Sequence, residues 1–469
     1  MKSKPVLSIL SSFALVSATV FAQKPVQPNV IFILTDDLGY GDLGCYGSKL
    51  NRTPNLDNLA QNGIRFTDCY AAASICSPSR AALLTGRYPV RTGINGVFFP
   101  ESFSGIDSSE ILLPEVLQKA GYYTGIVGKW HLGHHRQFLP LQNGFNEYFG
   151  IPYSNDMQSV VYLRGNEVET WSVDQTQITK TYTDEAVRFI ERNKKRPFFL
   201  YLAHNMPHVP IFASDQFKGK SVNGLYGDVI EEIDWSVGEI IKKIRQLGLE
   251  ENTLIVFTSD NGPWLTEGPH GGSPGPLFQG KFTTWEGGQR VPAIAYWKGK
   301  IQPFVYTGVA SLMDWFPTII SLARSSVPAD RNIDGQSLTD VLLKNTKRQN
   351  EDFCFISNGK IEAYRSGDYK IILPKKVVKG NFWVADVPAH DTVLFNVRLD
   401  MGETKDLFRS DPVKVKELVS RLEKFRGTLI NITPDKIQSD GSAGNLTTKA
   451  RQELIRIAKE NGVKSKTDK

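Results

Sequence analysis

Two short apolar runs that end abruptly in polar side chains place the strongest limit on how this chain can fold. Val30–Leu34 is followed by Asp36-Asp37, and Leu254–Phe257 is followed by Asp260-Asn261. A continuous apolar run of this length is typical of a strand that is buried on both faces of a parallel sheet. Functional sites gather beyond the carboxyl ends of such strands, so we expect the two polar ends to meet although they lie far apart in the sequence.

The segments between these runs complete an α/β pattern. Pro197–Leu202 predicts a third buried strand. Apolar residues at three- and four-residue steps from Val229 to Leu247 predict a helix, and Gly248 suits its carboxyl cap. We therefore expect an α/β fold with a large, mostly parallel sheet flanked by helices.

The sequence changes in character after about residue 350. Short β-rich pieces followed by an amphipathic helix predict a smaller carboxyl-terminal subdomain with an antiparallel sheet. The pieces are Asp352–Ser357, Tyr369–Leu373 and Thr392–Val397, and the helix is Pro412–Arg426. We therefore divide the chain into a main domain, residues 23–350, and a subdomain, residues 351–469.

The amino terminus has the pattern of a signal peptide. Two lysines precede an apolar run over residues 6–21, and Val20-Phe21-Ala22 offers small residues at suitable offsets for cleavage before Gln23. Residues 1–22 are therefore predicted to be removed from an exported protein, periplasmic or extracellular. A membrane anchor is disfavoured because serines interrupt the run and it is short for a spanning helix. We expect no membrane span after signal removal.

Net charge excludes one class of partner. The chain has 55 Lys and Arg residues against 49 Asp and Glu, a formal net charge of +6. This balance mildly favours anionic substrates but falls far short of a nucleic-acid-binding signature. We therefore expect no nucleic-acid partner.

The most specific motif is CSPSRAALLTGR, residues 76–87. It resembles the signature of the sulfatase family, in which the first cysteine is oxidised after synthesis to formylglycine. Further segments match the family in order, at residues 29–47, 128–133, 150–154, 204–210, 260–262 and 280–292. A joint match of this extent is far more specific than a lone Cys-x-Pro-x-Arg. The resemblance implies an alkaline-phosphatase-like fold, a catalytic role for residues 23–350 and hydrolysis of sulfate esters.

Elementary chemistry supports a reactive position at Cys76. Pro78 suits the first turn of a helix, so Cys76 would lie at a helix amino terminus, where free N–H groups and the helix dipole favour negative charge. The alternative is a buried or merely reactive cysteine. With Cys76 reserved for chemistry, Cys45, Cys69 and Cys354 can form at most one disulfide, and at least one thiol stays free.

Asp36, Asp37, Asp260 and the side-chain carbonyl of Asn261 form an all-oxygen set. Such a set fits a hard cation such as Ca²⁺ or Mg²⁺ better than it fits zinc. The resemblance implies that these four positions bind one Ca²⁺. The alternative is that the side chains only cap strand ends.

The resemblance also assigns roles to basic side chains. Arg80, Lys129 and Lys281 would be active-site cations. In the family mechanism a hydrated formylglycine attacks sulfur, and His208 with Lys281 would protonate the departing alcohol oxygen. His131, assisted by Lys129, would then take the proton that lets the aldehyde re-form and expel sulfate.

Ser154 and His204 are the candidate substrate-binding residues. Ser154 resembles a substrate-binding position of arylsulfatase A-like members, and its alternative is a loop hydroxyl bonded to nearby backbone. His204 follows the third predicted strand, and its alternatives are a supporting position behind the site or the surface.

Counting charge modestly favours sulfate over phosphate. Three carboxylates, a divalent cation and three basic side chains sum to +2. An ionised formylglycine hydroxyl and a sulfate monoester together cancel that charge, whereas a phosphate monoester dianion would leave the cluster negative.

An exported enzyme of this kind is expected to act on a sulfated polysaccharide or oligosaccharide, and a formylglycine-generating or equivalent maturation enzyme is its implied protein partner. Lys375, Lys376 and Lys379 beside Phe382-Trp383 could touch a sulfated sugar chain, or they could form a solvated basic loop.

Two other functions stay open. One is a phosphodiesterase or phosphonate hydrolase of the same superfamily, and the other is a non-catalytic sulfated-glycan-binding protein in which Cys76 is never oxidised.

Overall fold

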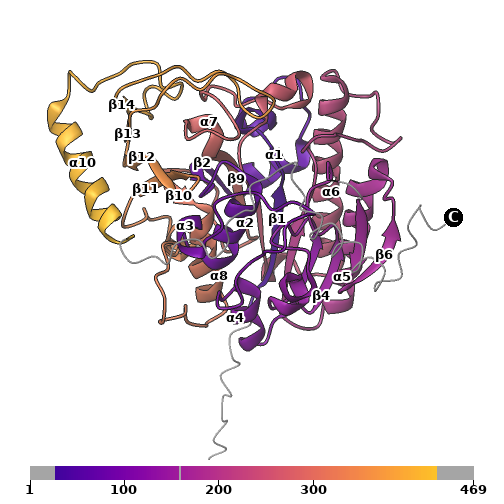
Figure 1. Ribbon diagram of the computed structural model, residues 1–469. Coiled ribbons are helices and arrows are strands. Elements are labelled where there is room, and N and C mark those ends of the chain that lie inside the picture. The colour runs from indigo at the N-terminus through magenta and orange to yellow at the C-terminus, as the bar shows by residue number, and fades with distance from the viewer. Residues whose placement is uncertain (1–26, 158–159, 430–469) are drawn as a thin grey trace, which may run out of the picture.

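The computed structural model describes residues 27–157 and 160–429, and one large sheet forms its centre (Figure 1). From edge to edge the strand order is β10-β2-β9-β8-β1-β7-β3-β4-β5-β6. The strands are β10 (Phe304–Ser311), β2 (Ile64–Tyr70), β9 (Arg290–Tyr296), β8 (Thr253–Ser259), β1 (Asn29–Thr35), β7 (Phe198–Ala203), β3 (Tyr123–Gly128), β4 (Glu147–Gly150), β5 (Val161–Arg164) and β6 (Glu167–Trp171). The predicted signal peptide, residues 1–22, lies outside the described residues.

The strands at the centre of the sheet are parallel. β1 pairs in parallel with β7 on one side and with β8 on the other, and β3 also pairs in parallel with β7. These three strands, β1, β7 and β8, are the ones predicted from the apolar runs, and all of their residues are buried. Antiparallel pairs occur only around β9 and along β4-β5-β6 in the described sheet. The carboxyl ends of β8, β1, β7 and β3 therefore share one edge.

Helices cover both faces of the sheet, because alternate residues of a strand point to opposite sides. Residues 30, 32 and 34 of β1 pack in one apolar core with α2, α4 and α8, whereas residues 31 and 33 pack in another with α1, α5 and α6. The helices are α1 (Pro54–Gln61), α2 (Cys76–Thr85), α4 (Leu113–Lys119), α5 (Ile178–Asn193), α6 (Gly224–Gln246) and α8 (Trp315–Leu322). The helix predicted up to Leu247 is α6, and Gly248 follows it at φ 68°.

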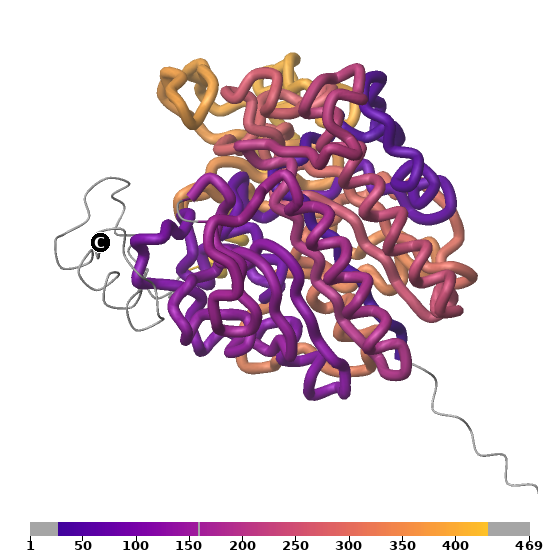
Figure 2. The backbone as a smooth tube through the Cα atoms, turned by 90° about the vertical axis from the view of Figure 1, so that its right-hand side faces the viewer, coloured from indigo at the N-terminus to yellow at the C-terminus, as the bar shows by residue number. Residues whose placement is uncertain are grey.

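A second, antiparallel sheet lies beside the β10 and β2 end of the large sheet in Figure 1, and an orange loop of this part of the chain stands out at the upper left of Figure 2. Its strands are β11 (Asp352–Ser357), β12 (Lys360–Ser366), β13 (Tyr369–Ile372) and β14 (Val393–Asn396). Helix α10 (Pro412–Gly427) packs on it through Leu418 and Leu422. The predicted β pieces and helix are therefore present, and β12 is an addition. The predicted boundary at residue 350 falls between α9 (Thr339–Lys344) and β11, and the division into domains stays a prediction.

Buried charged side chains join the two sheets. Lys370 on β13 pairs with Glu286 at 3.1 Å and with Glu403 at 2.8 Å. Arg365 on β12 pairs with Asp68 on β2 at 2.6 Å. Glu286 opens the short helix α7 (Glu286–Gln289), so these pairs fix the segment just before β9 against the small sheet.

All four cysteines lie within the described residues and are free, so the single disulfide that the sequence allowed does not form. Cys69, Cys76 and Cys354 are buried, and Cys45 is partly exposed. Stability therefore comes from the core and not from cross-links. Within residues 27–157 and 160–429, no helix is both long and apolar enough to cross a membrane.

Candidate active site

The site lies where the central strands end. Asp36-Asp37 follows β1, Asp260-Asn261 follows β8, and Lys129 and His131 follow β3. Because these strands are parallel neighbours, their carboxyl ends bring side chains from distant parts of the sequence to one place. His208 comes from the loop after β7, and Lys281 from the segment between β8 and α7. All of these side chains are buried.

Cys76 is the first residue of α2, so its side chain lies at a helix amino terminus as the sequence predicts. Its Sγ donates a hydrogen bond to Asp36 Oδ1 at 3.3 Å. Burial, and next the negative charge of Asp36, raises the pKa of the Cys76 thiol well above its ordinary value. The unmodified thiol therefore stays protonated and is a poor nucleophile at neutral pH.

Each buried carboxylate of the site has a basic partner. Lys129 Nζ pairs with Asp36, and Lys281 Nζ pairs with Asp37 at 2.7 Å. Arg80, four residues after Cys76 on the same helix, donates from Nε to Asp260 Oδ2 at 2.9 Å, and its Nη2 lies 2.8 Å from the same oxygen in an ion pair. Its Nη1 donates to the carbonyl of Lys129 at 2.9 Å. The three predicted cations therefore surround the carboxylates within one buried cluster.

The charges of the cluster act on one another. Burial raises the pKa of Asp36, but Lys129, His208 and Arg80 more than offset this and hold that pKa well below its ordinary value. Burial, and next the charge of Asp36, raises the pKa of Asp260 to about 7. The cluster thus concentrates both signs of charge in a water-poor space, where electrostatic interactions are strong.

Two histidines present a ring nitrogen to the cluster. His208 Nδ1 donates to the carbonyl of Val209 at 2.5 Å, which turns Nε2 towards Asp37 Oδ2 at 3.6 Å. His131 Nε2 donates to the carbonyl of Phe98 at 2.9 Å, and Nδ1 has no hydrogen-bond partner among the described residues. Burial, and next a neighbouring lysine in each case, lowers the pKa of both rings. Each neutral ring therefore keeps one nitrogen able to accept a proton.

The two predicted substrate-binding residues lie in different surroundings. Ser154 is buried, and its Oγ accepts a hydrogen bond from Lys129 Nζ at 3.2 Å, so it belongs to the cluster. His204 is also buried, but its Nε2 faces Ser236 of α6 at 3.3 Å. Burial lowers the pKa of His204 to about 4. The geometry gives His204 a supporting position behind the site, and its role in substrate binding stays a prediction.

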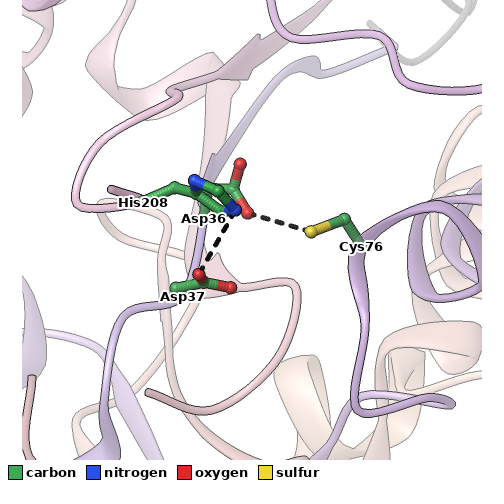
Figure 3. A group of neighbouring side chains, drawn as sticks. All are labelled: Asp36, Asp37, Cys76 and His208. Atoms are coloured by element: carbon green, nitrogen blue, oxygen red, sulfur yellow. Dashed lines mark hydrogen bonds and ion pairs between the residues drawn. The ribbon is translucent and has the colours of Figure 1, made fainter. Parts of the chain in front are cut away.

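The donor set fits a hard cation. Ligand atoms of Asp36, Asp37, Cys76 and His208 all lie within 4.8 Å of one another (Figure 3). Asp260 and Asn261 adjoin this group, because Asp260 Oδ1 accepts from the Asp37 amide at 3.3 Å and Asn261 Nδ2 donates to Asp37 Oδ1 at 2.7 Å. Asn261 Oδ1 is buried with no hydrogen-bond partner among the described residues. A buried oxygen left without a donor next to two carboxylates is what an oxygen-ligated cation would satisfy.

Two residues of the site have a left-handed backbone conformation. Asp37 and His131 adopt positive φ values of 63° and 60°. This left-handed conformation is uncommon outside glycine, although aspartate and histidine adopt it more readily than most other residues. Asp37 lies two residues after the end of β1 and His131 three residues after the end of β3, so both turns are at the edge of the sheet where the site lies.

Trp264 is a residue of the site that the sequence pattern did not predict. Trp264 is buried, its ring lies 4.4 Å from Lys281 Nζ, and its centroid lies 5.6 Å from that of His208. The only indication in the sequence that Trp264 belongs to the site was its closeness to Asp260-Asn261. An aromatic residue in a loop carries no periodicity, however, so the signal was weak.

Comparisons with known proteins agree with this geometry. The Sulfatase family model matches residues 28–325. The chain is 43% identical to N-acetylgalactosamine-6-sulfatase of Mus musculus over 396 residues, which cover 78% of this chain and 75% of that protein. A structure from Bacteroides thetaiotaomicron, described under the metabolism of multiple glycosaminoglycans, superposes with a TM-score of 0.79 at 30% identity and covers 86% of this chain and 99% of that one. The Ps i-CgsB protein in complex with k-i-k-neocarrahexaose superposes with a TM-score of 0.75 at 29% identity and covers 94% of this chain and 100% of that one. The chain therefore belongs to the sulfatase family, whose members are sulfuric ester hydrolases.

Proposed function

We propose that this hydrolase acts on sulfate esters of a sulfated oligosaccharide or polysaccharide, with Cys76 converted to formylglycine and with one bound Ca²⁺. The observation that carries the proposal is the buried cluster in which Cys76 lies 3.3 Å from Asp36 while Arg80, Lys129 and Lys281 pair with the surrounding carboxylates. Three carboxylates and three cations leave the cluster near neutrality. A divalent cation would therefore make it attractive to an anionic ester.

Asp36, Asp37, Asp260 and Asn261 would hold the Ca²⁺. When bound, the ion supplies positive charge that draws in the ester and the attacking group. The unpartnered oxygen of Asn261 and the closeness of Asp36 and Asp37 support this assignment. Formylglycine at position 76 supplies a carbon that can carry two hydroxyl groups, which a thiol cannot supply.

The chain's own residues would bind the ester and move protons. Arg80 is fixed by Asp260 and by the Lys129 carbonyl, so its guanidinium is held in one orientation against the site. Lys129 and Ser154 lie together, and we assign them to the oxygens of the sulfuryl group. His131, with Nδ1 free, would accept the proton from residue 76.

Lys281 and His208 would serve the leaving oxygen. Both contact Asp37 Oδ2, from Nζ at 2.7 Å and from Nε2 at 3.6 Å, so they lie on the same side of the cluster. A sugar alkoxide is a poor leaving group, and protonation of its oxygen during bond cleavage removes that obstacle. Lys281 Nζ can donate to this oxygen directly, and His208 Nε2 can do so once it has taken up a proton.

The names of the relatives and structural neighbours indicate which substrate should be tested first. The Mus musculus relative is named for N-acetylgalactosamine 6-sulfate, and the structural neighbours are described with glycosaminoglycans and with a neocarrahexaose. We therefore propose that an N-acetylgalactosamine 6-sulfate unit within a glycan is the first substrate to test. The signal-peptide pattern supports export to the periplasm or beyond, and the motif that begins at Cys76 implies maturation by a formylglycine-generating or equivalent enzyme.

The decisive experiment compares a sulfate and a phosphate ester of the same alcohol. Protein produced with a maturation enzyme should show the higher kcat/KM on the sulfate ester, and mass spectrometry of the peptide that contains residue 76 should show the thiol replaced by an aldehyde. A preference for the phosphate ester would favour the phosphohydrolase alternative. An unmodified Cys76 in protein that still turns over sulfate esters would overturn the assigned chemistry.

A further inference from the structure

Two exposed aromatic side chains lie on a hairpin of the small sheet. The chain between β13 and β14 folds back on itself through bridges between Lys375 and His390 and between Val378 and Val387, and we call residues 375–390 the hairpin. Near its tip, Phe382 is 64% exposed and Trp383 is 42% exposed. Large aromatic surface is seldom left in water without a function when neighbouring rings extend it into a patch.

The backbone of the tip is held in place although its side chains are exposed. Trp264 Nε1 donates to the Trp383 carbonyl at 3.0 Å, and Thr266 Oγ1 donates to the Phe382 carbonyl at 2.8 Å. Asn381 Oδ1 accepts from the Trp383 amide at 2.7 Å. These bonds present the two rings in a fixed orientation, which reduces the entropy lost when a ligand binds.

The rings of the tip continue directly into the active site. The Trp383 ring stacks on Trp264 with centroids 5.5 Å apart and an interplanar angle of 9°, and it meets Phe282 edge-on at 5.8 Å. Trp264 in turn lies against Lys281 and His208, the pair assigned to the leaving oxygen. A series of contacting aromatic rings therefore extends from the solvent-exposed tip to the side of the site assigned to the leaving group.

The sequence of contacts from Trp383 through Trp264 to Lys281 indicates how far the tip of the hairpin lies from the reacting ester. One complete aromatic ring, that of Trp264, separates Trp383 from Lys281. A sugar that carries the reacting ester would occupy the space beside Lys281 and His208. The tip would therefore face the next sugar along a chain. Lys376 and Lys379 lie on the same hairpin, are exposed, and have no ion-pair partner among the described residues.

We propose that Phe382 and Trp383 form a subsite for the sugar unit next to the one whose sulfate is cleaved. Pyranose rings present apolar C–H faces that pack on aromatic rings, and the neighbouring lysines suit further sulfate groups on such a chain. The occupant is a pyranose of a sulfated glycan, and the inference rests on the proposed function. It makes the enzyme selective for oligosaccharides over isolated sulfated monosaccharides.

The test compares chain length. Trp383→Ala and Phe382→Ala variants are assayed on a 6-sulfated N-acetylgalactosamine oligosaccharide and on the monosaccharide N-acetylgalactosamine 6-sulfate. On the oligosaccharide we expect KM to rise about tenfold in Trp383→Ala and less in Phe382→Ala, with kcat little changed, since an aromatic contact is worth roughly a factor of ten or less. On the monosaccharide we expect kcat and KM to stay within about twofold of wild type. Trp383→Phe should restore most of the oligosaccharide KM.

The matched control is Trp171→Ala. Trp171 is 46% exposed on β6, at the far edge of the large sheet from the small sheet (Figure 1), and its removal should change neither substrate's KM. An equal loss on both substrates in Trp383→Ala, or a weaker inhibition by inorganic sulfate, would show that the tip only supports Trp264. An unchanged oligosaccharide KM in both tip variants would overturn the subsite.

A binding measurement separates this inference from the proposed function. Calorimetry with the Cys76→Ala protein and the sulfated oligosaccharide should show weaker binding when Trp383→Ala is added. If wild-type protein releases no sulfate from any ester but this difference persists, the subsite stands and the proposed function fails. If sulfate is released and the difference is absent, the subsite fails alone.

Discussion

Arg80 illustrates how one side chain supports both the fold and the chemistry of the site. It is completely buried, and it donates to Asp260 and to the carbonyl of Lys129. A planar guanidinium can make these bonds together, and a lysine ammonium cannot reproduce their geometry. The role of Arg80 was accessible from the sequence only through its motif, because an isolated arginine gives no sign that it is buried.

Arg80→Lys should therefore lower both stability and activity. A buried carboxylate and a buried carbonyl would lose donors, which costs about 2 to 4 kcal/mol in the free energy of unfolding. Urea denaturation measures this loss. Arg136→Lys is the control, because Arg136 and its partner Glu167 are exposed and the change should be within about 0.5 kcal/mol. Equal effects of the two substitutions would contradict the role given to Arg80.

Calcium binding can be tested without an activity assay. Thermal unfolding of chelator-treated protein should shift upward when Ca²⁺ is added, by about 2.7 kcal/mol of stability at a free concentration of roughly one hundred times Kd. Asp36→Asn should remove most of the shift, because Asp36 lies at the centre of the cluster. Asp215→Asn, at an exposed carboxyl, should keep it. Failure of Ca²⁺ to stabilise the wild-type protein would contradict the assigned ligands.

At the scale of elements, the parallel strands were predictable and the junction between the sheets was not. β1, β7 and β8 are buried on both faces, so their sequences are continuous apolar runs that indicate their environment directly. β12 contains Lys360, Glu362 and Arg365, a composition typical of an exposed segment. Arg365 is nevertheless fully buried, because its partner Asp68 comes from a distant strand. No local pattern reveals such a pairing.

The junction also predicts a pH dependence. Burial raises the pKa of Glu403 to about 7, since Lys370 offsets only part of this effect and the negative charge of Glu286 raises the pKa further. A carboxyl with a raised pKa in the folded state stabilises the protein below its unfolded pKa, and that stability is lost as the pH rises through about 7. For this group the loss is roughly 2 to 3 kcal/mol between pH 4.5 and pH 7.5.

Glu403→Gln should remove that loss. The variant should therefore gain stability relative to wild type as the pH rises across this interval, as measured by urea unfolding at several pH values. Glu423→Gln, at an exposed position on α10, is the control and should follow the wild-type profile. A constant difference between Glu403→Gln and wild type at every pH would contradict the assignment.

At the scale of the molecule, the large sheet depends on the small one. Tyr70, Tyr88 and Met313 of the main domain are buried in an apolar core with β11, β12 and α10. Glu286, close to Lys281 in sequence, is also fixed by Lys370 of the small sheet. The change in sequence pattern after residue 350 predicts two parts of the chain. Such a pattern gives no information about how much surface the two parts bury against each other.

Residues 23–350 alone should therefore fail to fold into a stable unit. Without the small sheet, buried apolar rings would be exposed and the charges of Asp68 and Glu286 would lose partners. We expect an aggregation-prone product with no cooperative thermal transition, as judged by circular dichroism and size-exclusion chromatography. A soluble fragment that unfolds cooperatively at the temperature of the full chain would show that the two parts are independent domains.

The most direct test of the whole account is sulfate release from an aryl sulfate by wild-type protein and by Cys76→Ala, both produced with the same maturation enzyme. The account predicts many turnovers by wild type and no release above the buffer rate by Cys76→Ala, with both proteins showing the same circular dichroism spectrum. Equal release by the two proteins would contradict it, because the reaction would then not use residue 76.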